Sequence, residues 1–252
     1  MSQNDPAILY QFPISHYCEK ARWALDFKGL RYQIVNLAPG LHMRKTRKMG
    51  CAGSTLPILQ FRSSTVQGSD AIVDFLDREL SERRLTPADQ EQAEEAMNWE
   101  KLLDREVGIH LRRFIYFHVL PNSALAKRLI LHQATLATKT VFTLSFPLIR
   151  SFMRRGMNIR PETAEKSRHR LEQAFAQLNA RLKSHPYLAG ERFSRADLSA
   201  AALLAPLCMP PEHPFPFPKE EEMPEPLRSF QRAHRQDPFF AWTLKMYREH
   251  RG

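Results

Sequence analysis

The sequence contains few of the residues on which several protein classes depend. Only three of its 252 residues are cysteines, at positions 18, 51 and 208, and they are too far apart for a disulfide framework or a metal-binding motif. The most apolar window, residues 198–209, contains a proline and is too short to cross a bilayer. The first residues lack the basic start and apolar run of a signal peptide. We therefore expect a cytoplasmic protein that binds no metal ion and does not enter a membrane.

Acidic residues are outnumbered, which gives the chain a formal net charge of +10 at pH 7. The excess of lysine and arginine is spread over both halves of the chain. Tight basic clusters occur only at residues 44–48 and at Arg112–Arg113, and neither belongs to a recognisable nucleic-acid-binding motif. We expect no nucleic-acid partner, and the charge favours attraction of small anionic molecules instead.

The stretch from residue 7 to residue 29 organises the rest of the chain. Residues 7–11 are predicted to form a strand, which a proline-containing turn connects to a helix at about residues 16–28. Ser15 stands at the N-cap position, and Gly29 suits the left-handed conformation just past the helix. The free backbone N–H groups and the dipole at such a helix start favour a negative charge, including that of a thiolate.

Short strands alternate with helices up to about residue 80. The pattern predicts strands at residues 31–37, 55–61 and 65–67, a loop at residues 38–53, and a helix at residues 69–80. A proline near the start of the 55–61 strand belongs at a strand end or edge, because it cannot donate a ladder hydrogen bond. These elements predict a compact α/β domain.

No strand pattern follows residue 85, and the remainder is predicted to be helical. A capping box at Ser194 and Asp197 opens an apolar helix, Pro147 is expected to kink or interrupt the helix that contains it, and a proline-dense segment at residues 210–226 is expected to be irregular. The predicted helices span residues 87–120, 123–155, 161–183, 196–207, 226–235 and 238–250.

Four short motifs occur in a characteristic order. They are residues 15–18 (Ser-His-Tyr-Cys), 55–57 (Thr-Leu-Pro), 68–72 (Gly-Ser-Asp-Ala-Ile) and 187–197. In this order and spacing the chain resembles the glutathione transferase superfamily, in particular its theta-like, omega-like and bacterial members, over nearly its whole length. The resemblance implies a thioredoxin-like, glutathione-binding domain at residues 1–84 and an all-α domain at residues 87–252, which would form the acceptor-substrate site. It also implies a homodimer with a role in detoxification.

The resemblance assigns glutathione-binding roles to three residues. The proline that matches Pro57 is cis in the family, so that the preceding residue, here Leu56, pairs with the cysteinyl main chain of glutathione. The serine that matches Ser69 binds the γ-glutamyl carboxylate, which suits the free N–H groups of a helix start.

The chain departs from the family at Gly68, where glutamate or glutamine is usual. This departure puts the affinity for glutathione in doubt, and Asp70 or Gln67 could compensate. The glycine carboxylate of glutathione usually meets a basic residue from the loop after the second strand. The candidates in this loop are Lys45, Arg44 and His42.

The resemblance makes Ser15 the catalytic residue. A serine hydroxyl that donates to the glutathione sulfur favours the thiolate and lowers the pKa of the thiol. Serine cannot form a mixed disulfide, so conjugation is favoured over thiol–disulfide exchange. Cys18 is the alternative and would support a glutathione-dependent peroxidase or thiol transferase, although we expect it to be buried and inert. Tyr10 should face away from the site, and His16 is expected to be a solvent-exposed loop residue.

An acceptor site is expected between the turn at residues 12–17 and the first helices of the α domain. Arg112 or Arg113 near this cleft would suit an anionic or polarised electrophile. The other candidates are Met97, Trp99, His110, Phe114, Tyr116 and Phe117. The prediction is therefore a transferase that joins glutathione to a hydrophobic electrophile. A further alternative is a non-catalytic interaction protein of the same fold, which Gly68 and the 210–226 segment favour.

Overall fold

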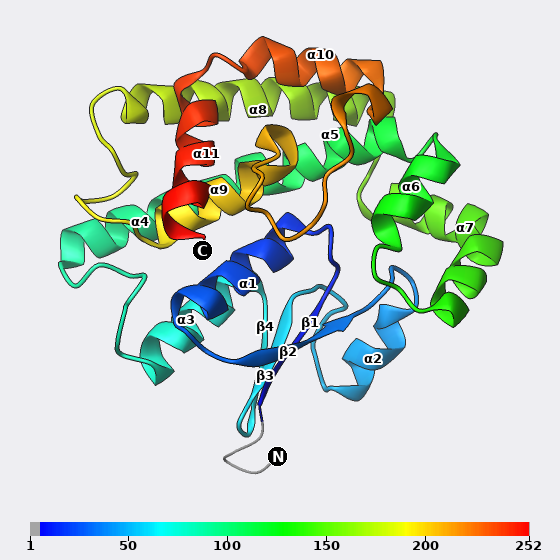
Figure 1. Cartoon of the computed structure of the whole chain (residues 1–252), viewed down its shortest axis with the longest axis horizontal. Coiled ribbons are helices and arrows are strands. Elements are labelled where there is room, and N and C mark those ends of the chain that lie inside the picture. The colour runs from blue at the N-terminus through cyan, green and yellow to red at the C-terminus, as the bar shows by residue number, and fades with distance from the viewer. Residues whose placement is uncertain (1–5, 252) are drawn as a thin grey trace.

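The N-terminal part of the chain forms a mixed four-stranded sheet in the order β2-β1-β3-β4 (Figure 1). The computed structural model describes residues 6–251. Strand β1 runs parallel to β2, whereas β3 is antiparallel to both β1 and β4. The strands are β1 (Ala7–Gln11), β2 (Tyr32–Asn36), β3 (Ile58–Phe61) and β4 (Ser64–Gln67).

Helices cover both faces of this sheet. Helices α1 (His16–Phe27) and α3 (Ser69–Glu79) pack together on one face, and α2 (His42–Lys48) lies on the other (Figure 1). The alternation of side chains along β1 reflects this division. Gln11 Oε1 accepts a hydrogen bond from Arg22 of α1 at 2.5 Å, whereas the ring of Tyr10 lies under Lys45 of α2.

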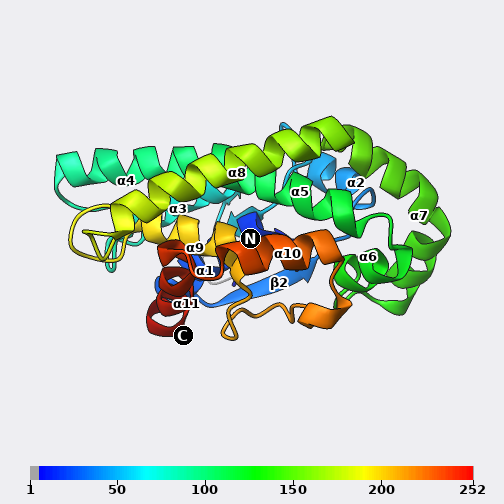
Figure 2. The same cartoon turned by 90° about the horizontal axis from the view of Figure 1, so that it is seen from above.

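The remaining helices form a layer beside the sheet domain (Figures 1 and 2). Helix α8 runs along α5, and α9 lies in the middle of the layer, where it contacts α1, α4 and α11. Within residues 6–251, no helix is both long enough and apolar enough to cross a bilayer. The elements are α4 (Gln90–Leu103), the π-helix η1 (Asp104–Gly108), α5 (Ile109–Val119), α6 (Ser123–Ile130), α7 (Leu136–Gly156), α8 (Pro161–Leu182), α9 (Arg195–Cys208), the 3-10 helix η2 (Glu220–Glu222), α10 (Glu225–His234) and α11 (Pro238–His250).

Helix α9 is the core of the helical layer, and nearly all of its residues are buried. Its alanine-rich sequence lets the surrounding helices approach closely. The capping box predicted at its start is present, with both the N–H and the hydroxyl of Ser194 donating to Asp197 Oδ2 at 2.9 Å. The Asp197 carboxylate also accepts from the backbone N–H of Leu188 at 2.8 Å, so it holds the preceding loop in place.

A buried ionic network joins the sheet domain to the helical layer. The ammonium group of Lys20 in α1 lies 2.7 Å from Glu100 of α4 and 2.9 Å from Asp104 of η1. Arg195 of α9 binds the other oxygen of Glu100 at 2.5 Å and reaches Asp74 of α3 at 2.6 Å. Lys20 and Arg195 therefore each pair with two carboxylates, and each of the two cations bridges the sheet domain and the helical layer.

Three sequence predictions about helices differ from the structure. Residues 42–48, predicted as loop, form α2, because a short basic segment carries no clear apolar periodicity. The single helix predicted at residues 123–155 is two helices, separated at residues 131–135, where Gln133 has a φ of +58°. Pro147 lies inside α7 and does not interrupt it. The buried side chains Phe146 and Ile149 on either side of Pro147 hold that part of the helix against the core.

Candidate active site

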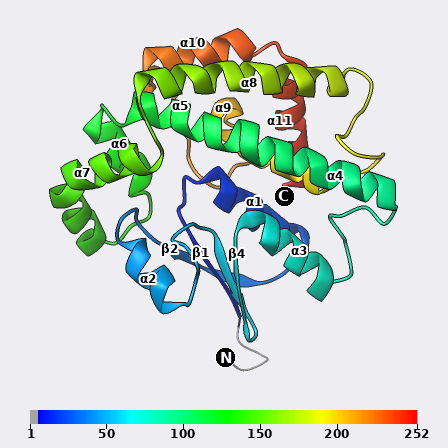
Figure 3. The same cartoon turned by 180° about the vertical axis from the view of Figure 1, so that it is seen from behind.

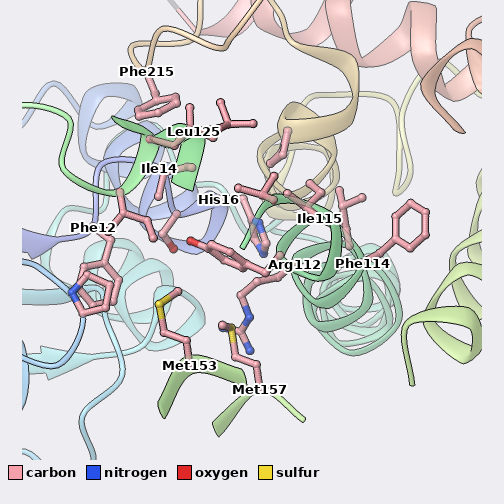
Figure 4. A pocket seen from close by; sticks show the side chains of 18 of the residues that line it. Phe12, Ile14, His16, Arg112, Phe114, Ile115, Leu125, Met153, Met157 and Phe215 are labelled. Atoms are coloured by element: carbon pink, nitrogen blue, oxygen red, sulfur yellow. The ribbon is translucent and has the colours of Figure 1, made fainter. Parts of the chain in front are cut away.

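A cavity of about 360 Å³ lies between the sheet domain and the helices (Figure 4). The turn before α1 and residues 54–56 form its wall on the sheet side. One face of α5 lies opposite, and residues from α6, α7 and the 206–230 region complete the lining. Helices α6 and α7 lie together at the end of the helical layer nearest α2 (Figure 3). The lining is mostly apolar, so the cavity suits a hydrophobic ligand that carries a few polar groups.

Ser15 stands on this cavity at the start of α1. Its backbone is extended, and its Oγ accepts a hydrogen bond from the backbone N–H of Cys18 at 3.4 Å, as expected of an N-cap. The hydroxyl proton is not used in that bond. The oxygen therefore lies at the positive end of the helix dipole, and its proton can be donated to the nearby Cys18 thiol or to a ligand.

Leu56 lines the same cavity, and the Leu56–Pro57 peptide bond is cis. The backbone of Leu56 makes no hydrogen bond to another residue in the described part of the chain. Gln67 holds the loop before it, with its side-chain amide donating to the carbonyl oxygens of Thr55 at 2.8 Å and Gly53 at 3.0 Å. An unpaired main-chain segment is thus presented to the cavity that Ser15 also lines.

Ser69 and Asp70 begin α3 and are not among the residues that line the cavity. Ser69 is buried and Asp70 is exposed. Gly68, at the N-cap, has a φ of +104°, and a Cβ atom there would lie 2.9 Å from Asp70 Oδ1. This conformation explains why glycine occupies a position where the family usually has glutamate or glutamine.

The three basic candidates from the loop after β2 are placed differently. Arg44 and Lys45 are exposed on α2, and the ammonium group of Lys45 lies 5.1 Å from the centre of the Tyr10 ring. His42 is buried and lines the cavity, with its ring edge-on to Phe12 and its Nδ1 without a hydrogen-bond partner in the described chain. Burial lowers the pKa of His42.

Cys18 and His16, the two other candidate reactive residues near Ser15, are both buried. Cys18 is inaccessible to solvent, and burial raises the pKa of its thiol in spite of the hydrogen bond with Ser15. His16 is only 5% exposed, so the prediction of a solvent-exposed loop histidine is wrong. Burial, followed by the nearby charge of Arg112, lowers the pKa of His16 to about 3. The imidazole is therefore neutral at physiological pH.

The acceptor-site candidates divide between lining and structural roles. Arg112, Phe114 and Tyr116 line the cavity, whereas Arg113 turns away and donates to the carbonyl oxygen of Met157 at 3.0 Å and to Ser167 Oγ at 3.1 Å. The candidates that do not line the cavity are Met97, Trp99, His110 and Phe117.

Sequence reasoning missed the lining that comes from α6, α7 and the proline-dense segment. The interleaved prolines and phenylalanines of residues 213–218 were a usable signal, because prolines hold the chain extended while the aromatic rings reach inward. This missed set includes Leu125, Leu129, Phe152, Met153, Met157, Phe215, Phe217, Met223 and Leu227. In the described part of the chain, no cluster of three or more histidine, cysteine, aspartate or glutamate side chains could hold a metal ion.

Comparison with known proteins identifies the two parts of the chain separately. Residues 9–84 match the family model "Glutathione S-transferase, N-terminal domain", and residues 133–237 match "Glutathione S-transferase, C-terminal domain". A curated glutathione S-transferase from Pseudomonas putida is 26% identical over 190 residues, which are 75% of this chain and 70% of that protein.

Solved structures share the fold at low sequence identity. A beta-etherase from Sphingobium sp. strain SYK-6 is 20% identical, with a TM-score of 0.63 over 96% of this chain and 100% of that one. A glutathione S-transferase from Methylobacterium radiotolerans, solved in complex with glutathione sulfonate, is 18% identical, with a TM-score of 0.56 over 95% of each chain. The sheet, the helical layer and both family matches agree: this chain is a member of the glutathione transferase superfamily.

Proposed function

We propose that the protein is a glutathione transferase in which Ser15 stabilises the thiolate of bound glutathione. The observation that carries the proposal is the position of the Ser15 hydroxyl. Its oxygen accepts a hydrogen bond from the Cys18 N–H at the start of α1, and Ser15 lines the same cavity as Leu56, so its proton can turn toward a ligand bound there. A hydrogen bond donated to the sulfur favours the charged form and lowers the pKa of the thiol.

The unpaired backbone of Leu56 gives the tripeptide a main chain with which to pair, next to the cis bond at Pro57. Ser69 and the free N–H groups of α3 bind the γ-glutamyl carboxylate, and Asp70 binds its ammonium group. For the glycine carboxylate, the buried position of His42 on the cavity makes it the better candidate, and Lys45 on the exposed face of α2 is the alternative.

The reaction is attack by the thiolate on a hydrophobic electrophile. The apolar lining from α5, α7 and the proline-dense segment holds the acceptor and excludes water, which strengthens the interaction between the Ser15 hydroxyl and the sulfur. We further propose that the protein acts as a cytoplasmic homodimer, as members of this family commonly do.

Calorimetric titration with glutathione tests the proposal. We expect one tripeptide bound per chain, and a Ser15→Ala variant that still binds glutathione but catalyses its conjugation to 1-chloro-2,4-dinitrobenzene more slowly. Ser15→Thr keeps the hydroxyl and serves as the control. The absence of binding at millimolar glutathione would refute the proposal and favour a non-catalytic interaction protein.

A further inference from the structure

The cavity contains one charged side chain without an ionic partner. Among its lining residues in the described chain, Arg112 alone carries a charge at neutral pH, since the histidines at positions 16 and 42 have lowered pKa values. Arg112 takes part in none of the ion pairs between described residues, and its buried Nε has no hydrogen-bond partner. The guanidinium group lies over the ring of Tyr17, at 5.8 Å from the ring centre.

This arrangement differs from that of the neighbouring arginine. Arg113 is held by Met157 and Ser167, so it has a structural role that Arg112 lacks. A guanidinium group in an apolar cavity loses hydration, and this loss is offset only when hydrogen bonds and an opposite charge replace the water. The described residues around Arg112 supply neither and offer only the face of the Tyr17 ring, which indicates that a ligand supplies them.

A second donor stands on the same side of α5. Tyr116 follows Arg112 by one helical turn, and residues four apart share a face of a helix. Burial raises the pKa of Tyr116 to about 12, so its phenol keeps its proton. The hydroxyl makes no hydrogen bond to any described residue. His16 lies beside Arg112 in the cavity (Figure 4), and its neutral ring adds no second charge.

We propose that Arg112, assisted by the Tyr116 hydroxyl, binds a carboxylate on the acceptor substrate. The acceptor is then an amphipathic monoanion, whose apolar body fills the space bounded by Phe114, Met153 and Phe215 while its carboxylate meets the guanidinium group. This inference rests on the proposed transferase function and names its substrate class. A single guanidinium with one neutral donor matches a planar monoanion, whereas a phosphate dianion would need further cations.

Two acceptors that differ only in this charge test the proposal. In 4-chloro-3-nitrobenzoate and 4-chloro-3-nitrobenzamide, the thiolate forms a carbon–sulfur bond at the carbon that loses chloride, and chloride leaves with the bonding electron pair. We expect Arg112→Met to lower kcat/KM for the benzoate by about tenfold or more, since it removes a charge-assisted hydrogen bond, and to change that for the benzamide less than about twofold. Arg112→Lys should retain part of the preference.

Arg105→Met is the matched control, because it removes the same charge from an exposed position, where Glu106 is the only ionic partner of Arg105 among residues 6–251. It should leave both acceptors unaffected. Equal losses for the two acceptors in Arg112→Met would overturn the proposal, and a raised pKa in the pH profile of kcat/KM would then show that Arg112 acts on the thiolate. An unchanged variant would overturn it as well.

A binding measurement separates this proposal from the transferase function. Calorimetry of 4-chloro-3-nitrobenzoate and the benzamide against the glutathione-free protein requires no catalysis. We expect tighter binding of the benzoate, with the difference lost in Arg112→Met and kept in Arg105→Met. If glutathione failed to bind while this difference persisted, the transferase function would be wrong and the anion site would stand. Equal binding of the two compounds would overturn the anion site alone.

Discussion

Replacing Lys20 by methionine should weaken the junction between the sheet domain and the helical layer. Lys20 is fully buried, and its ammonium group lies within 3 Å of both Glu100 and Asp104. Breaking a buried ion pair by removing one partner typically costs about 3–5 kcal/mol, because the other charge is left buried and unpaired. The cost is reduced here, since Glu100 keeps Arg195 at 2.5 Å and Asp104 is partly exposed. We therefore expect a loss of about 2–4 kcal/mol.

Urea denaturation at pH 7.5 measures this loss as a lower midpoint. Lys101→Met, which removes the same charge from an exposed position next to Glu100, is the control and should change stability by less than about 0.5 kcal/mol. Burial already raises the pKa of Asp104 while Lys20 opposes that shift, so the variant should raise it further. The stability difference between the variant and the wild type should then shrink at lower pH, where Asp104 is protonated. A Lys20→Met protein as stable as the control would contradict this account of the junction.

Three further predictions concern the site. Cys18→Ser should keep at least half of the transferase activity toward 1-chloro-2,4-dinitrobenzene, because the Cys18 thiol is buried and its pKa is raised. Loss of activity would instead favour the peroxidase or thiol-transferase alternative. The pKa of His16 is about 3 in the folded protein, below the value of the unfolded chain, so the free energy of unfolding should fall by roughly 1.4 kcal/mol per pH unit as the pH drops below about 6.5. His16→Gln should flatten this slope in urea denaturation. An unchanged slope would refute the neutral buried ring. Ser69→Ala should raise the Kd for glutathione by about tenfold in calorimetry, as expected for loss of a hydrogen bond to a carboxylate, and an unchanged Kd would limit Ser69 to starting α3.

The regular elements could be predicted because their sequence patterns are local. The strand at residues 7–11, the helix that Ser15 opens, and the helices at residues 161–182 and 238–250 all follow from periodicity and capping residues. Helix α2 could not be predicted in this way, because residues 42–48 are mainly basic and polar and owe their helix to the surrounding structure.

Much of the candidate site depends on contacts that the sequence pattern does not encode. His16 is buried near Gly108 and Arg112, which lie more than ninety residues away in the chain. The choice between Arg112 and Arg113 was equally hidden, because neighbouring residues on a helix point in different directions and only the position of α8 decides which one is held by Ser167. The proline-dense segment at residues 210–226 is predicted to be irregular; it is so apart from η2 and the first residues of α10, and its place on the cavity follows from the path of the chain after α9.

The central claim is that the sulfur of glutathione lies beside the Ser15 hydroxyl and is ionised there. Spectrophotometric pH titration of the thiolate in the complex with glutathione tests this claim directly. We expect the pKa of the bound thiol to lie at least one unit below that of free glutathione, and Ser15→Ala to remove most of this shift, since a hydrogen bond to a charged group contributes about 1.5–3 kcal/mol and one pKa unit is about 1.4 kcal/mol. A bound thiol that titrates like the free tripeptide, or a shift that survives in Ser15→Ala, would contradict it.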